Sequence, residues 1–369
     1  MTPDYLDCVA RAVAAERAGD ATAALEWHQS VPMFSKGRHR ALTERLADLA
    51  EDPPPWVWAR WTIYQTLRCE DGATGNLVQA RLREVVTEIH GDLLAACYRH
   101  RGDPIRVIAR VMGESWAFHQ LAAHESGGLA AFIDEHATGR LDEHAALAQR
   151  WAGSRMSGYE LGESRPGARL AVRDAGGGEW LDVLDLGARG CARGGWALGR
   201  LVPSGVGDLL MFDMPPLGVP SKIAEEVAGR GDGDWWRVVA AAVRRGRLGP
   251  AIFLREDYGL TTDVLDLELL RFGTRARDLA RVTQQLRAGR DEVSRAAYRV
   301  LERARRGDVA ATDQAYVAAA AMNVRAFDDL RRQMLRTNEP DHWAEWAGLL
   351  VEPARSRVLA LAQLGDSAA

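Results

Sequence analysis

The residues best suited to chemistry are the histidines and glutamates between positions 84 and 144. Most of the nine histidines of the chain lie in this stretch, with glutamates interleaved among them. Carboxylates and imidazoles on facing helices of a bundle can bind transition-metal ions. We therefore take Glu84, Glu88, His119 and His124 as candidate metal ligands. The stretch contains no Glu-x-x-His motif, and a five-residue offset turns His124 away from His119 on a helix, so solvated polar faces are the alternative.

A second candidate site lies in a glycine-rich stretch, where Val183-Leu184-Asp185-Leu186-Gly187 reads as an apolar strand, an acidic residue and a glycine turn. This string resembles the first motif of class I methyltransferases. The resemblance implies that the backbone at Gly187 approaches S-adenosylmethionine, with Asp185 beside it. Further on, Asp213-Met214-Pro215-Pro216 is similar to the Asp-Pro-Pro turn of the amino-methylating members.

Three departures weaken that resemblance. Arg189 stands where the family has its central glycine, and the two motifs are too close together for the strand–helix units between them. The downstream chain also has helical spacing instead of alternating strands and helices. Turns between the strands of a small barrel or meander are the alternative interpretation of both strings.

Tryptophan and arginine clusters are the candidates for binding a macromolecule. The chain has twelve Trp against seven Phe, and one predicted contact surface comprises Trp56, Trp58, Trp61, Trp235 and Trp236. Such rings serve in partner binding or base stacking, and otherwise in core packing. The candidate phosphate-binding residues are Arg244, Arg245, Arg247, Arg305 and Arg306. The net charge of only −4 argues against a wholly basic surface.

Helical spacing accounts for most of the elements that must position these residues. Ala14-Ala15-Glu16-Arg17-Ala18-Gly19-Asp20, followed by small residues and Trp27, resembles a tetratricopeptide-type hairpin, and the resemblance covers residues 5–49. It implies two closely packed helices joined at Gly19-Asp20, with a groove for a partner. Similar joints end at Gly102-Asp103 and Gly307-Asp308. They follow no fixed period, so an irregular helical bundle is the alternative.

The sequence thus predicts a mainly α protein in three parts: a helical domain over 1–156, a small β-rich module over 157–219 and a helical domain over 220–369.

The sequence contains no apolar run long enough to predict a membrane span, and the first residues lack the features of a signal peptide. We therefore expect a cytoplasmic protein. The scattered cysteines form no CxxC pair, and no catalytic elbow or Walker A loop is present.

The function that we expect from these features is non-catalytic: a regulatory or adaptor protein, without a cofactor, that binds a protein partner. The N-terminal helices and the β module are the predicted contact regions, and self-association is compatible with the Trp clusters. One alternative is a nucleic-acid-binding regulator that uses the arginine clusters. The other is an enzyme with a metal site in the helical bundle or a degenerate S-adenosylmethionine site.

Overall fold

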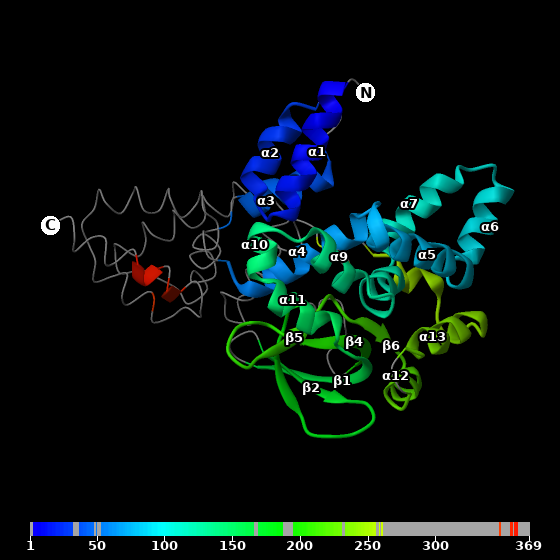
Figure 1. Ribbon diagram of the computed structural model, residues 1–369. Helices are drawn as coiled ribbons and strands as arrows, with labels where there is room; N and C mark the ends of the chain where they lie inside the picture. The colour runs from blue at the N-terminus through cyan, green and yellow to red at the C-terminus, as the bar shows by residue number, and fades with distance from the viewer. Residues whose placement is uncertain are drawn as a thin grey trace, which may run out of the picture. The chain divides into compact units, whose positions relative to one another are not determined.

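The structure is a computed structural model (Figure 1). It describes residues 3–31, 37–47, 49, 53–165, 169–186, 195–230, 233–255, 258, 260, 347, 355–356 and 358–360. The chain divides into two compact units, and the first comprises Met1–Ala47, Pro54–Glu163 and Leu170–Val264. Every described residue of the sites considered below lies in this first unit. The helices predicted between residues 265 and 365 lie almost entirely outside the described residues.

Helices make up most of the described chain. Those that precede the strands are α1 (Pro3–Arg17), α2 (Ala21–Gln29), α3 (Arg38–Ala47), α4 (Pro55–Arg68), α5 (Gly72–Glu88), α6 (Gly91–Arg99), α7 (Pro104–Glu114), α8 (Trp116–Gln120), the π-helix η2 (Leu121–Glu125), α9 (Gly128–His136), α10 (Gly139–Glu143) and α11 (Ala145–Ala152). Those that follow them are α12 (Ser221–Ala228), α13 (Trp235–Arg244) and the 3-10 helix η3 (Pro250–Phe253). No helix among the described residues is both long and apolar enough to cross a membrane.

In two helical hairpins an aspartate caps the second helix. Gly19 has a φ of +71° between α1 and α2, a left-handed value that glycine adopts without strain. Asp20 then accepts a hydrogen bond from the backbone N–H of Ala23 at 2.9 Å and so caps α2. Between α6 and α7, Asp103 accepts one from the backbone N–H of Ile105 at 2.9 Å. The predicted joints at these two places are therefore confirmed as helix ends.

Helix α4 lies at the centre of the helical part. Nearly all of its residues from Trp56 to Thr66 are buried, including the charged Arg60. A helix that is buried on every side needs neighbours all round it. Helices α1, α5, α9, α10 and α11 supply them (Figure 1).

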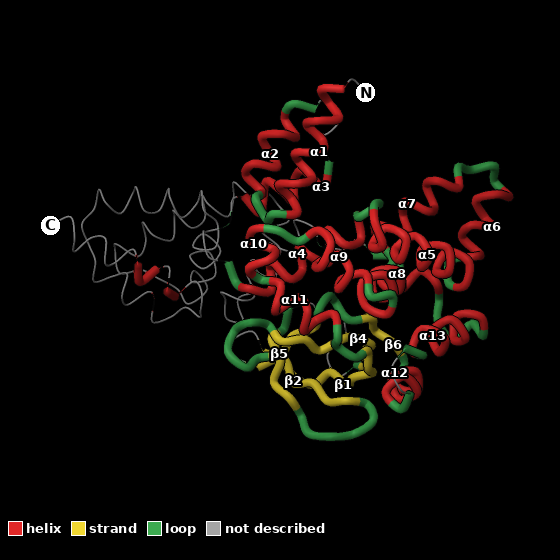
Figure 2. Tube along the Cα trace, viewed as in Figure 1, coloured by secondary structure: helices red, strands yellow, loops and turns green. Residues whose placement is uncertain are grey.

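The strands run from Met156 to Val219 and belong almost entirely to the same compact unit as the helices around them. They are β1 (Met156–Arg165), β2 (Arg169–Asp174), β3 (Leu181–Leu184), β4 (Trp196–Pro203), β5 (Leu210–Phe212) and β6 (Leu217–Val219). They form one sheet in the order β1-β2-β3-β5-β4-β6, and an antiparallel pairing of β1 with β4 closes the first five into a small barrel. Figure 2 shows the strands gathered below α4, α9, α10 and α11, with α12 and α13 beside them.

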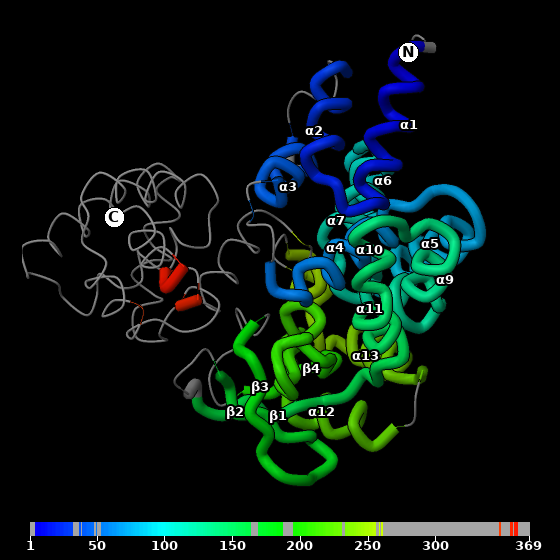
Figure 3. The backbone as a smooth tube through the Cα atoms, turned by 60° about the vertical axis from the view of Figure 1, so that its left-hand side comes forward, coloured from blue at the N-terminus to red at the C-terminus, as the bar shows by residue number. Residues whose placement is uncertain are grey.

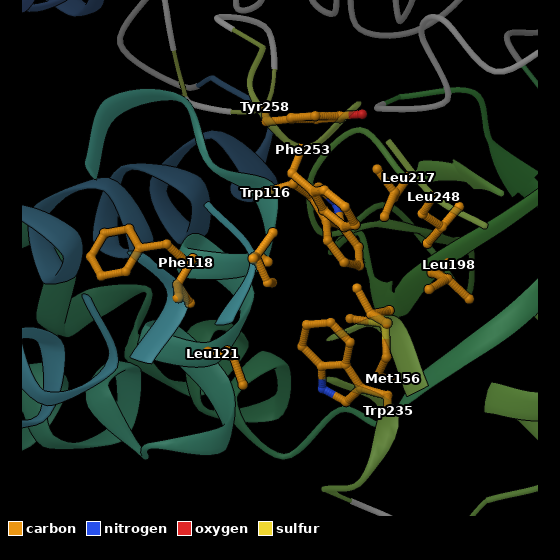
Figure 4. Packing of buried hydrophobic residues seen from close by; sticks show 14 of the residues in the cluster. Trp116, Phe118, Leu121, Met156, Leu198, Leu217, Trp235, Leu248, Phe253 and Tyr258 are labelled. Carbon is orange, nitrogen blue, oxygen red and sulfur yellow. The ribbon is translucent and has the colours of Figure 1, made fainter. Parts of the chain in front are cut away.

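The barrel packs on the helices through a shared apolar core. This core includes Trp116 from α8, Met156 from β1 and Trp235 from α13 (Figure 4). The rings of Trp116 and Trp235 meet edge to face, with their centroids 5.4 Å apart. The chain is therefore mainly α-helical with a small β module. This core joins the two, while the barrel strands enclose a second apolar cluster of their own.

Helix α12 lies directly on strand β1 (Figure 3). A Cβ atom added to Gly158 would lie only 2.0 Å from the carbonyl oxygen of Ala224. Glycine is therefore required here by the close approach of two backbones.

Candidate functional site

The glutamates proposed as metal ligands are paired with arginines. Glu84 forms an ion pair with Arg81 one turn away, at 2.5 Å. Glu88 pairs with Arg244 from α13 at 2.6 Å, so one of the predicted phosphate-binding arginines is engaged by a carboxylate. These contacts account for both glutamates without a metal ion.

The two histidines proposed with them face other partners. The Nε2 atom of His119 lies 2.7 Å from the carbonyl oxygen of Met112, and the Nε2 atom of His124 lies 3.0 Å from a carboxylate oxygen of Asp213. Each of the four predicted ligands thus has a different neighbour. The structure does not bring them together.

Asp213 is the centre of a buried polar network. Its Oδ2 atom accepts hydrogen bonds from Gln120 Nε2 at 2.8 Å and from His124 Nε2. The buried guanidinium of Arg60 donates to the backbone oxygens of Asp213, at 2.8 Å, and Phe212, at 3.0 Å. Burial opposes ionisation of Asp213, but the bond from His124 and the nearby cations outweigh it and lower its pKa. Burial lowers the pKa of Arg60 to about 9.

The network continues through a second ion pair. Arg200 Nε donates to Gln120 Oε1 at 2.7 Å, and its guanidinium binds Glu125 and the backbone oxygen of Ser154. The indole N–H of Trp235 also donates to Glu125. The two arginines balance the two carboxylates, as buried charges require. The network connects α4, η2, β4 and α13, so its geometry indicates a structural joint.

The predicted tryptophan surface is mostly core. Trp56, Trp58, Trp61 and Trp235 are buried, and Trp236 is partly buried. In this conformation the first four are out of reach of a partner. Their burial agrees with the packing alternative for large rings at helix seams.

The remaining predicted residues are only partly described. Arg245 and Arg247 are exposed just after α13, whereas Arg305 and Arg306 lie outside the described residues. Asp185 follows β3 and is partly buried, and Gly187 also lies outside the described residues.

Strand β3 has a different setting from that of the methyltransferase motif. It pairs in parallel with β5 inside the small barrel, at Val183–Leu210 and Leu184–Met211. The fold implied by that resemblance is instead a doubly wound sheet with helices on both faces.

The α6–α7 hairpin presents apolar side chains to solvent. None of the nine residues of α6, all of which the structure describes, is buried. Tyr98 at the end of α6 is 62% exposed, and Ile105 and Ile108 on α7 are 70% and 36% exposed. The two isoleucines are one turn apart, so they lie on the same face of α7. Figure 1 shows the hairpin at the edge of the helical part.

Arginines surround these exposed apolar residues. Arg99, Arg101 and Arg106 are exposed at the joint and in the first turn of α7. Arg110 is also exposed and pairs with Glu114 at 2.8 Å. Tyrosine and arginine are among the residues that carry most of the binding energy in protein interfaces.

A buried cluster of ligand-type atoms joins the first three helices. Glu16 of α1 is 3% exposed, and its Oε1 atom lies 2.9 Å from Nε2 of His28 in α2 and 2.6 Å from Nε2 of His39 in α3. These three ligand atoms lie within 4.8 Å of one another. One carboxylate oxygen and two imidazole nitrogens therefore converge on one point.

The outer atoms of the cluster are held by α4. Gln65 Nε2 donates to the second carboxylate oxygen of Glu16 at 3.1 Å, and the Tyr64 hydroxyl lies 3.0 Å from Nδ1 of His39. Burial opposes ionisation of Glu16, but the hydrogen bonds from His28 and His39 outweigh it and hold the pKa at about 2. Burial lowers the pKa of His39. The cluster thus combines an ionised carboxylate with a neutral imidazole at neutral pH.

Sequence reasoning missed this cluster because its members are far apart in the chain. One local signal was available: the buried residues of α2 are Ala21, Ala24 and His28, so the histidine continues the apolar face of that helix. Glu16 likewise follows the buried Ala12 by one helical turn. A polar residue on an otherwise apolar face must find a polar partner.

Comparison of the chain with protein-family models, with curated proteins and with solved structures finds no match.

Proposed function

We propose that this chain is a non-catalytic regulatory or adaptor protein that binds a protein partner through the α6–α7 hairpin. The observation that carries the proposal is the exposure of Tyr98, Ile105 and Ile108 on a hairpin whose first helix buries no residue. Burying those three side chains against a partner would stabilise the complex. Folding of the chain alone does not provide this stabilisation, because it leaves the side chains exposed.

The surrounding chemistry supports a protein as the partner. An aromatic ring and two aliphatic side chains, flanked by arginines, match the anchor-and-rim composition of protein interfaces. The exposed cations Arg99, Arg101 and Arg106 favour a partner segment that carries acidic residues beside its own apolar ones.

The tetratricopeptide-type resemblance belongs to the same proposal. In this interpretation α1–α2 and α6–α7 are two hairpins of one scaffold, each with an aspartate that caps its second helix, Asp20 and Asp103. Helical hairpins of this kind present faces and grooves to extended or helical peptides.

Site-specific photo-crosslinking in the source organism tests the proposal. A photoreactive amino acid replaces Ile105 in one full-length variant and Leu6 in the control, because Leu6 is also an exposed apolar residue, at 56%, but lies on α1. We expect one defined partner to crosslink at position 105 and not at position 6. Absence of a crosslinked protein at position 105, or the same proteins at both positions, would contradict the proposal.

A further inference from the structure

The geometry points to a zinc-type metal site formed by Glu16, His28 and His39, which bind the ion through Oε1 and the two Nε2 atoms. This inference is independent of the α6–α7 surface. Two histidines and one glutamate are an established three-ligand set for Zn²⁺, with water or another group in the fourth position.

The spacing of the three atoms suits a small cation. Oε1 of Glu16 lies 2.9 Å and 2.6 Å from the two Nε2 atoms. A tetrahedral ion with bonds of about 2.0 Å separates its ligand atoms by about 3.3 Å. To admit the ion, Oε1 of Glu16 therefore needs to part from the two Nε2 atoms by about 0.4 and 0.7 Å.

The outer contacts are those that a metal site needs. A ligating histidine is oriented by a hydrogen bond at its other ring nitrogen, and a ligating carboxylate by one at its other oxygen. Tyr64 makes the first kind of contact with His39, and Gln65 makes the second with Glu16. Both residues belong to α4, and most residues of this helix are buried. The helix therefore holds the two hydrogen-bonding side chains in place.

Access to the site is narrow. The side chains of Glu16 and His28 are 3% and 5% exposed, whereas that of His39 is 16% exposed. A fourth ligand therefore approaches on the side of His39. Such a small opening fits the single open position of four-coordinate zinc better than the wider opening that an iron site with several exchangeable positions needs.

The packing around the site indicates that a bound ion would stabilise the fold. The buried apolar residues of α1 and α2 are three alanines, Ala12, Ala21 and Ala24, and the larger described apolar side chains of these helices are only partly buried or exposed. A metal ion that ties α1, α2 and α3 together stabilises the folded state by its binding free energy.

A second cluster in the described residues serves as a contrast. Cys69, Asp71 and His136 also bring ligand atoms together. Arg17 already occupies that place, with its NH2 atom 2.7 Å from Oδ1 of Asp71 and its NH1 atom 3.4 Å from Nδ1 of His136. A guanidinium among the ligand atoms repels a second cation. The guanidinium near the Glu16 cluster, that of Arg68, instead bonds to Tyr64 and not to a ligand atom.

Zinc titration of the full-length chain, stripped of metal by a chelator, tests the inference. The test variant is His39→Gln, and the matched control is His136→Gln, because the two side chains have similar exposure, 16% and 13%. We expect the wild type and the control to bind one Zn²⁺ tightly and to unfold at a higher temperature with it. The affinity of His39→Gln for Zn²⁺ should fall by more than ~10–100-fold, which is the cost of losing a hydrogen bond that orients a metal ligand. Equal uptake by both variants, or none by the wild type, would overturn the inference.

The proton positions on His39 provide a second readout that needs no variant. If a proton joins His39 Nε2 to Glu16, its Nδ1 atom accepts the Tyr64 hydroxyl; if zinc holds Nε2, the proton must be on Nδ1. Nitrogen-15 NMR distinguishes the two tautomers. We expect one equivalent of Zn²⁺ to convert His39 from the first to the second, and an unchanged tautomer would contradict the site.

Discussion

The Nε2 atom of His124 lies 3.0 Å from Oδ2 of Asp213, although 89 residues separate the two in the chain. Their side chains are 1% and 0% exposed. The contact fixes the π-helix η2 to the segment between β5 and β6, so it joins the helical part to the β module. Both residues were singled out by sequence motifs for other roles, a metal ligand and part of a methyltransferase-like turn.

We predict that Asp213→Asn destabilises the protein by about 3 kcal/mol, because it removes the buried negative charge that acts on the guanidinium groups of Arg60 and Arg200. Urea unfolding followed by Trp fluorescence measures the change. The exposed Asp208 provides the control, Asp208→Asn, which should stay within about 0.5 kcal/mol of the wild type. Equal stability of the two variants would show that the network is not a structural joint.

We predict that Gly158→Ala costs about 1–3 kcal/mol, because its methyl group meets the carbonyl oxygen of Ala224 and pushes α12 off β1. Gly218→Ala is the matched control, since a Cβ atom there meets nothing within 4 Å. Thermal unfolding by circular dichroism compares the two. A Gly158→Ala protein as stable as the control would mean that α12 does not pack this closely.

We predict that the free energy of unfolding decreases in mild acid because of the buried imidazole of His90. Burial lowers its pKa from 6.5 to about 4, so the unfolded chain takes up a proton at a higher pH than the folded one does. Its contribution is thus fully present above pH 6.5 and is lost as the pH falls toward 4, by at most about 3 kcal/mol. His90→Gln retains a polar contact to Ser115 without titrating and should show a flatter profile over this window. The exposed His100→Gln should keep the wild-type slope; if His90→Gln keeps it as well, the buried imidazole is not its cause.

Asp103→Ala should loosen the start of α7, because the variant loses the cap on the backbone N–H of Ile105. The loss of such a cap costs about 1 kcal/mol. Hydrogen exchange followed by mass spectrometry should show faster exchange over the first turn of α7 and no change in α5. Asp92→Ala serves as the comparison, because Asp92 is an exposed aspartate in the first turn of α6, whose N-cap residue is His90. Equal exchange in the two variants would contradict the capping role.

The local features of the fold could be predicted from sequence because their causes are local. Glycine and aspartate at Gly19-Asp20 and Gly102-Asp103 end one helix and cap the next, and these residues act through their immediate neighbours. The change from helical to strand spacing near Ser157 likewise marked the start of β1.

The side-chain clusters could not be predicted because they depend on long-range packing. His124 was expected beside Glu84 or Glu88, but the π-helix turns it toward Asp213 instead. No sequence spacing encodes that contact, and the same holds for Glu16 with His39. The exposure of Tyr98 could not be predicted either, because the burial of an apolar residue on a helix depends on which elements pack beside it.

The most direct test of the proposed function is the affinity of the crosslinked partner for surface variants of the purified full-length chain. Ile105→Ser with Ile108→Ser removes exposed side chains and should leave the fold intact, and Leu6→Ser is the control. We predict that the double variant binds at least tenfold more weakly, a loss of about 1.4 kcal/mol, while the control binds like the wild type. Unchanged affinity of the double variant would contradict binding through the α6–α7 hairpin.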